Sequence, residues 1–258
     1  DVKAILKEAW QQTLLSRMSI NIGILFVLLL GMFVSLLTSN MMGGVEIVLQ
    51  DPQATMLLNI VVTVVIWPFL AGIEMMGVYH AHGLKTRGVM VFSFLQRGSW
   101  VALCALLTSV LISLGFQLLI VPGIFMAVVL SLTIPLVVDK KLSPMKAITV
   151  SVMALRFKFF QLFRLYLLLF IALLALVAPI ILVGESSLGP LTIMLFLFGM
   201  TFLAPLYYNV KGIVYREVFG STDLINESMD NDDNSNEQRH SDNNKIDKPD
   251  DSDDTFSA

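Results

Sequence analysis

Residues 118–151 read LLIVPGIFMAVVLSLTIPLVVDKKLSPMKAITVS, and this stretch decides the fold. Val121-Pro122-Gly123 separates two apolar runs and predicts a chain reversal, because proline fixes φ and glycine tolerates unusual backbone angles. The second run ends abruptly at Asp139-Lys140-Lys141, and Ser143-Pro144 then opens a segment with helical spacing. The stretch therefore predicts a helical hairpin in the membrane, followed by a helix on the membrane surface.

The composition agrees with a membrane protein. Of the 258 residues, 56% are hydrophobic and only 14% are charged, whereas soluble domains usually contain about 25% charged residues. The single cysteine, Cys104, cannot form an intramolecular disulfide, so the cysteine content does not indicate a redox compartment.

Charge divides the chain into two regions. Residues 1–220 contain 14 Lys and Arg against 8 Asp and Glu, a net charge of +6, whereas residues 221–258 contain 3 against 12, a net charge of −9. The second region is rich in Asn, Asp and Ser, and we expect a disordered acidic tail in the cytoplasm. This tail is either a solvated, self-repelling segment or a docking segment for a basic protein partner.

Six apolar segments lie within residues 1–220, and most are long enough to cross a bilayer core of about 30 Å. They occupy residues 20–37, 56–79, 100–120, 124–138, 165–183 and 191–210. We therefore predict an all-α integral membrane domain with six transmembrane helices arranged as three hairpins.

A partly apolar segment precedes each predicted hairpin, at residues 1–17, 81–99 and 143–164. The first and third of these segments have apolar residues along one helical face and polar residues elsewhere. We expect them to be amphipathic helices at the cytoplasmic interface. The three units share this layout without evident sequence identity, so an internal duplication does not follow from it.

The basic residues predict the orientation in the membrane. The N-terminus, residues 80–99, residues 139–164 and residues 211–258 hold 3, 3, 6 and 5 Lys and Arg, which account for all 17. The alternate connections have none. Because basic loops remain in the cytoplasm, both termini are expected there.

The run Val121-Pro122-Gly123-Ile124, followed by Pro135, by Val138-Asp139-Lys140 and by a helix bearing Ser and Ala, resembles the YciC-like (UPF0259) family of bacterial inner-membrane proteins. It is more distantly similar to the membrane domains of some glycerophosphodiester phosphodiesterases. The resemblance is best over residues 118–179. It implies a six-span protein of the bacterial cell inner membrane, and it supplies no activity or catalytic residues.

Glu74 is the only acidic residue within a predicted span. A charged group at the centre of a membrane helix costs about 2.5–3.5 kcal/mol on insertion scales, so such a residue is a candidate for function. Glu74 lies only about five residues from the cytoplasmic end, roughly 8 Å in a helix, within reach of the interface. It is therefore either paired for structural reasons or used to carry a proton, bind a cation or contact a basic lipid headgroup.

Other polar residues give weaker signals. Asn59 and Gln117 lie in or near spans and are expected to form hydrogen bonds between helices. His80 and His82 could form a metal site with Glu74 only if the helix were broken, because residues two apart point to different sides. We expect interfacial histidines and no metal site.

Basic residues follow the fourth predicted span and continue along the third surface segment. Clusters of this kind attract anionic lipid headgroups by about 1 kcal/mol per residue near the membrane surface. They also determine topology, and one cluster can do both. The candidate residues for binding anionic lipid are Lys140, Lys141, Lys146, Arg156, Lys158 and Arg164.

The sequence contains no glycine-rich phosphate loop, no HExxH or paired CxxC motif, and no Ser/His/Asp arrangement of the kind used in catalysis. We therefore expect no catalytic residues, no cofactor and no nucleic-acid partner. The leading hypothesis is a non-enzymatic protein that interacts with lipids or organises the membrane. The alternatives are a small transporter or channel with a cavity near Glu74 and, less favoured, a membrane-embedded enzyme.

Overall fold

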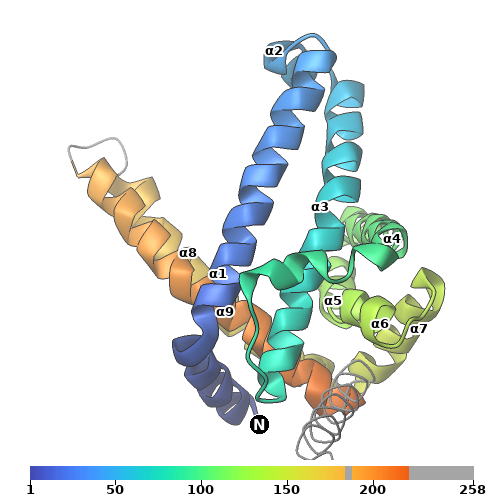
Figure 1. The fold of residues 1–258 in the computed structure, drawn as a ribbon, viewed down its shortest axis with the longest axis vertical. Helices are drawn as coiled ribbons and strands as arrows, with labels where there is room; N and C mark the ends of the chain where they lie inside the picture. The colour runs from blue at the N-terminus through green and yellow to red at the C-terminus, as the bar shows by residue number, and fades with distance from the viewer. Residues whose placement is uncertain (184–187, 221–258) are drawn as a thin grey trace, which may run out of the picture. The chain divides into compact units, whose positions relative to one another are not determined.

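The computed structural model describes residues 1–183 and 188–220, and these residues form helices and no β-strand. The all-α prediction is confirmed for this part of the chain. The acidic tail and residues 184–187 of the last predicted loop lie outside the described residues. The helices are α1 (Val2–Met41), α2 (Val45–Gln50), α3 (Pro52–Ala81), η1 (Gly88–Phe92), η2 (Leu95–Arg97), α4 (Gly98–Leu118), α5 (Ile120–Val129), α6 (Thr133–Asp139), α7 (Pro144–Leu155), η3 (Arg156–Lys158), α8 (Phe159–Val183) and α9 (Gly189–Phe219) (Figure 1).

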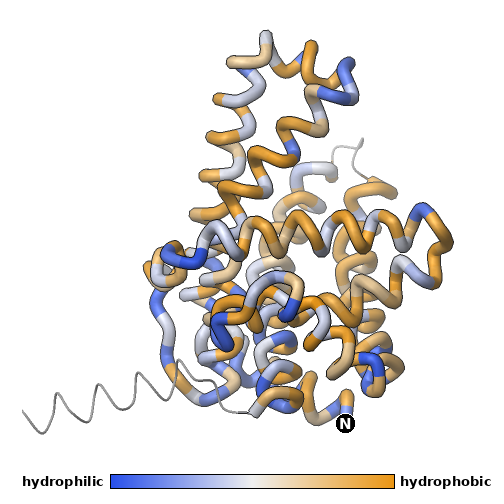
Figure 2. Tube along the Cα trace, turned by 90° about the vertical axis from the view of Figure 1, so that its right-hand side faces the viewer, coloured by the Kyte–Doolittle hydropathy of each residue, from blue (hydrophilic) through white to orange (hydrophobic). Residues whose placement is uncertain are grey.

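Six helical segments in the described residues have the length and apolar composition needed to cross a membrane, as the sequence predicts. Figure 2 shows helix bodies dominated by hydrophobic residues, with hydrophilic residues concentrated near helix ends and connections. The segments are Val2–Met41, Pro52–Ala81, Gly88–Leu118, Ile120–Asp139, Pro144–Val183 and Gly189–Phe219.

Helix α1 is longer than the first predicted span. It continues without interruption through 40 residues, so the amphipathic segment 1–17 and the span 20–37 form one helix. The Asp1 side chain caps its start by accepting a hydrogen bond from the Lys3 amide at 3.2 Å. The sequence between the two predicted segments contains no proline or glycine that would end a helix.

The chain reverses earlier than the Pro-Gly pair predicts. Helix α4 ends at Leu118, Leu119 is extended with φ −162° and ψ 158°, and α5 begins at Ile120. Pro122 therefore lies in the first turn of α5, where its missing N–H leaves no hydrogen bond unmade. A Cβ on Gly115 would lie 2.9 Å from the Gly123 Cα, so Gly123 allows a close helix crossing instead of forming the turn.

The predicted surface helix 143–164 is divided in the structure. Helix α7 ends at Leu155, η3 covers the next three residues, and α8 begins at Phe159. Phe159 to Arg164 therefore belong to the long apolar helix that follows. This boundary was missed because the apolar spacing continues through the 3₁₀ turn.

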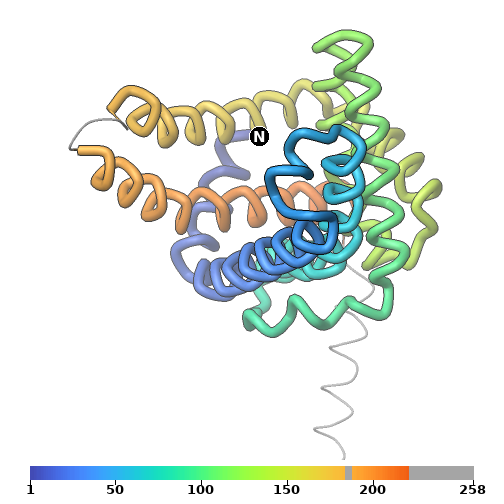
Figure 3. Tube along the Cα trace, turned by 90° about the horizontal axis from the view of Figure 1, so that it is seen from above, coloured from blue at the N-terminus to red at the C-terminus, as the bar shows by residue number. Residues whose placement is uncertain are grey.

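Helices α1, α3 and α9 pack against one another and form the centre of the described fold (Figures 1 and 3). Apolar side chains from α1 and α3 and from the 3₁₀ helix η1 form one continuous core cluster there. Its buried members are Ile20, Val27, Ile73, Met76 and Val91. Helix α4 packs on α3 and α5, and α8 packs on α9, so α3 and α9 connect the two sides of the fold.

Candidate functional site

Glu74 on α3 is paired with Lys211 on α9. The Lys211 Nζ lies 2.6 Å from the Glu74 Oε1, and their side chains are only 8% and 5% exposed. The second oxygen, Oε2, accepts no hydrogen bond from the described residues. Breaking a pair of this kind leaves a buried charge uncompensated, so the two residues stabilise the contact between α3 and α9 only when both are present.

A chain of buried and partly buried hydrogen bonds is centred on His80, six residues further along α3. The His80 Nδ1 is 2.8 Å from the Asn209 Oδ1, and the Asn209 Nδ2 is 2.9 Å from the Thr13 Oγ1. On the other side of the ring, the His80 Nε2 is 2.8 Å from the Thr86 Oγ1, which is 2.7 Å from the Ser19 Oγ. These contacts connect α1, α3, α9 and the loop after α3.

The hydrogen-bond directions follow from the fixed acceptor at one end of this chain. Thr13 donates its only hydroxyl proton to the Ala9 carbonyl at 2.8 Å, so the Asn209 amide nitrogen must donate to Thr13. The Asn209 oxygen is then the acceptor facing His80, and Nδ1 must carry the proton. A neutral His80 accepts from Thr86 through Nε2. The Thr86 oxygen then accepts the single Ser19 hydroxyl proton at 2.7 Å, in competition with the Ser16 carbonyl at 3.1 Å.

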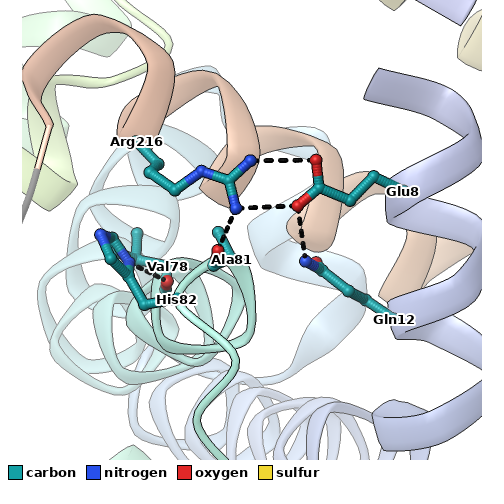
Figure 4. Close-up of polar contacts among 6 residues, drawn as sticks. All are labelled: Glu8, Gln12, Val78, Ala81, His82 and Arg216. Atoms are coloured by element: carbon teal, nitrogen blue, oxygen red, sulfur yellow. Dashed lines mark hydrogen bonds and ion pairs between the residues drawn. The ribbon is translucent and has the colours of Figure 1, made fainter. Parts of the chain in front are cut away.

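Arg216 makes a second contact between α9 and α1 (Figure 4). Its guanidinium donates to both carboxylate oxygens of Glu8, at 2.8 and 2.9 Å, and also to the Ala81 carbonyl at the end of α3. Gln12 donates to the same Glu8 carboxylate at 3.3 Å. The planar guanidinium therefore joins the ends of three helices, a geometry that the ammonium of lysine cannot reproduce.

Tyr215 connects α9 with the segment that follows the membrane hairpin predicted from residues 118–138. Its hydroxyl donates to the Asp139 Oδ2 at 2.6 Å, and both residues are buried. Lys140 lies near the same carboxylate, with its Nζ 3.8 Å from Oδ2. The polar edge Asp139-Lys140 is thus held against the last helix.

The two histidines do not converge on Glu74. His80 is buried within the hydrogen-bonded chain, and the His82 Nδ1 faces the Val78 carbonyl of its own helix at 2.9 Å. No group of three His, Cys, Asp or Glu in the described residues is placed to hold a metal ion. His80 is thus held by hydrogen bonds inside the fold.

Asn59 and Gln117 line the same groove, a cavity of about 640 Å³ between α3 and α4. Each belongs to a row of uncharged polar residues spaced four apart, so both rows follow one helical face. Within the described residues, neither side-chain amide makes a hydrogen bond. The rows are Thr55, Asn59 and Thr63 on α3 and Ser109, Ser113 and Gln117 on α4.

A second cavity, of about 500 Å³, lies between α5, α8 and α9. Three tyrosines line it, Tyr166, Tyr207 and Tyr208, and the Tyr166 hydroxyl donates to the Ser131 hydroxyl at 3.1 Å. Neither Glu74 nor Lys211 lines this cavity or the groove between α3 and α4.

The basic residues are distributed over several elements. Lys140 and Lys141 precede α7, Lys146 lies on it, Arg156 and Lys158 belong to η3, and Arg164 lies on α8. All are exposed except Lys140, which is partly buried beside Asp139. The Arg164 Nε donates to the Phe160 carbonyl of its own helix at 3.3 Å.

The partners on α9 were not predicted from the sequence. Asn209, Lys211, Tyr215 and Arg216 lie beyond or at the end of the predicted span 191–210, whereas α9 continues to Phe219. Lys211 and Tyr215 are four residues apart, a spacing that places them on one helical face. That spacing, combined with the need of Glu74 for a cation, could have identified Lys211.

Comparisons of this chain with protein-family models, with curated proteins and with solved structures find no match.

Proposed function

We propose that this chain is a six-span protein of the bacterial inner membrane, related to the YciC-like proteins, that binds anionic lipid on its cytoplasmic side without catalysing a reaction. In this proposal the apolar helices form three hairpins and both termini lie in the cytoplasm. The observation that carries the proposal is the exposed surface of α7 and η3, where basic residues alternate with large apolar side chains.

The inner face of α7 is held against the fold. Ala147, Ser151 and Leu155 are buried, and the Ser151 hydroxyl donates to the Val129 carbonyl of α5 at 2.5 Å. This contact fixes which side of α7 faces outward. The side chains of the outer face are therefore presented in a constant orientation.

The outer face has the composition of a helix that lies in a membrane interface. Large apolar side chains on α7, on η3 and at the start of α8 are 58–81% exposed, an arrangement that is unfavourable in water and favourable in lipid. They are Met145, Met153, Phe157 and Phe160. Lys146, Arg156 and Lys158 lie between them and are also exposed. Large apolar side chains would enter the acyl region while the cations meet anionic headgroups, each worth about 1 kcal/mol.

The transport alternative has less support, because it requires a cavity that reaches Glu74. The Glu74 carboxylate is instead closed by Lys211 in a buried pair, and Glu74 lines neither of the two cavities described above. A carboxylate that must carry ions would need access to water.

The proposal is tested by measuring which lipids surround the protein after extraction from its own membrane in polymer discs. The wild-type chain is expected to enrich phosphatidylglycerol over phosphatidylethanolamine relative to the bulk membrane. The triple variant Lys146→Gln, Arg156→Gln, Lys158→Gln should lose this enrichment. The matched control, Arg239→Gln, Lys245→Gln, Lys248→Gln, removes the same charge from the tail and should retain it. Equal enrichment in both variants would contradict the proposal.

The orientation is tested separately by cysteine labelling in intact cells, with Cys104→Ser as the background. A membrane-impermeant reagent should reach Glu46→Cys and should not reach Lys141→Cys. The opposite pattern would place the basic segments outside and would remove the basis for the proposed lipid contact.

A further inference from the structure

A cavity of about 470 Å³ lies between α1 and the loop that follows α3, and the lipid-binding surface described above does not include it. The loop contributes residues 83–86, and α1 contributes residues from Gln12 to Ser19. No Asp or Glu lines the cavity, whereas Lys85 does. The only formal charge among its lining residues is therefore positive.

The loop also presents hydrogen-bond donors that the described structure leaves unused. The amides of Gly83 and Leu84 donate to the carbonyls of His80 and Tyr79, at 2.9 and 3.0 Å. The next two amides, of Lys85 and Thr86, donate to no acceptor in the described part of the chain. Backbone amides without an internal acceptor and a lysine ammonium are groups that can donate to an anion.

The loop is held in place before any ligand arrives. The Thr86 hydroxyl lies between the His80 ring and the Ser19 hydroxyl, at 2.8 and 2.7 Å. His80 is 3% exposed and is itself bonded to Asn209. Because this side chain is fixed at both sides, the adjacent amides lose little freedom when they bind a ligand.

The other wall of the cavity is apolar. Leu15 and Met18 line it and are 86% and 66% exposed, at the point where α1 passes from its charged N-terminal turns to its apolar run. A free phosphate ion would use only the donors of the loop. A phospholipid would use the loop for its phosphate and these two side chains for its acyl chains.

We propose that this cavity binds one phospholipid molecule, with its phosphate group held by the Lys85 ammonium, by the amides of Lys85 and Thr86 and by the Ser16 hydroxyl. The inference rests on the membrane placement in the proposed function. It differs from the contact at α7 and η3, because one cavity holds a single lipid whereas that exposed surface attracts many.

The test is native mass spectrometry of the intact chain in detergent, titrated with dioleoylphosphatidylglycerol. One lipid should bind more tightly than all others in the wild type. Lys85→Gln should weaken that binding about tenfold, as expected for the loss of a hydrogen bond to a charged group. The matched control Lys7→Gln removes the same charge from an exposed site on α1 outside the cavity and should bind as the wild type does.

Two further arms identify the ligand. Ser16→Trp keeps Lys85 but fills the cavity, and it should also lose the single tight lipid. Dioleoylglycerol, which has the same chains and no phosphate, should bind about tenfold more weakly than the phospholipid. Inorganic phosphate that displaces the lipid at micromolar concentration would identify a free-anion site and overturn the lipid assignment.

The two proposals fail in different ways. Equal binding by Lys85→Gln and Lys7→Gln would overturn the cavity site, whatever the lipid enrichment in discs shows. The triple variant of α7 and η3 should keep the single tight lipid while it loses the enrichment. If that variant lost both the single tight lipid and the enrichment, the tight lipid would belong to the exposed surface, and the cavity proposal would be overturned.

Discussion

Gly77 of α3 and Gly212 of α9 meet where the two helices cross, and a Cβ on Gly212 would collide with the Gly77 carbonyl. A Cβ on Gly77 would collide with the Tyr208 carbonyl in turn. On α3, Gly77 lies midway between Glu74, which pairs with Lys211, and His80, which bonds Asn209. Because neither glycine has a side chain, α3 and α9 lie close enough for their buried polar side chains to pair.

Gly212→Ala is expected to destabilise the fold. Alanine favours a helix over glycine by about 1 kcal/mol, but overpacking costs about 1–3 kcal/mol and a backbone neighbour cannot move aside as a side chain can. Thermal unfolding in detergent should show a lower midpoint. In the control Gly31→Ala, the nearest atom is the tip of the Ile66 side chain at 2.7 Å, which can move. A stable Gly212→Ala variant would show that the crossing is looser than described.

Replacing one member of the Glu74–Lys211 pair should lower the free energy of unfolding more than replacing both. Glu74→Gln or Lys211→Met alone leaves a buried charge or polar group without its partner, with an expected loss of about 3–5 kcal/mol. The double variant Glu74→Gln, Lys211→Met should recover a large part of that loss. A double-mutant cycle of unfolding free energies measures this coupling, and strictly additive losses would contradict the buried pair.

Arg216→Lys should lower the thermal unfolding midpoint although it keeps the positive charge. Lysine cannot donate to both oxygens of Glu8 and to the Ala81 carbonyl at once. Since the Arg216 and Glu8 side chains are 32% and 38% exposed, solvent limits the expected loss to about 1 kcal/mol. Glu217→Gln, at the exposed neighbouring position, should leave the unfolding midpoint unchanged. Equal midpoints for the two variants would argue against the three-helix contact.

The tautomer of His80 provides a test that does not depend on stability. The Ala9 carbonyl accepts from Thr13, Thr13 accepts from Asn209, and the Asn209 oxygen accepts from His80. The neutral ring must therefore carry its proton on Nδ1. Nitrogen-15 NMR of labelled histidine should report this tautomer in the wild type. In Asn209→Leu, the acceptor at Nδ1 is lost, and the proton should move to Nε2 to bond Thr86. An Nε2 proton in the wild type would reverse the proposed directions.

The sequence predicts the helical class and the six apolar segments, because long runs without charge are sufficient for that inference. It misplaces the reversal near Pro122, because a proline in the first turn of a helix has the same local signature as a proline in a turn. It also divides α1 near Arg17, because a change from polar to apolar residues resembles a boundary even where the backbone continues.

The partners of the candidate residues were harder to predict. Glu74 stands out in the sequence, but Lys211 is 137 residues away, and their contact depends on how α3 crosses α9. The shared groove of Asn59 and Gln117 was more accessible to prediction. Both belong to rows of polar residues spaced four apart, and this periodicity is visible in the sequence.

The contacts of α9 determine when the fold can be completed during synthesis. The last helix supplies Asn209 to His80, Lys211 to Glu74, Tyr215 to Asp139 and Arg216 to Glu8. A ribosome that has made only the first five apolar segments has produced four polar groups whose partners on α9 are still missing. A chain that stops before α9 should therefore be degraded faster than one that contains this helix, because these four contacts cannot form.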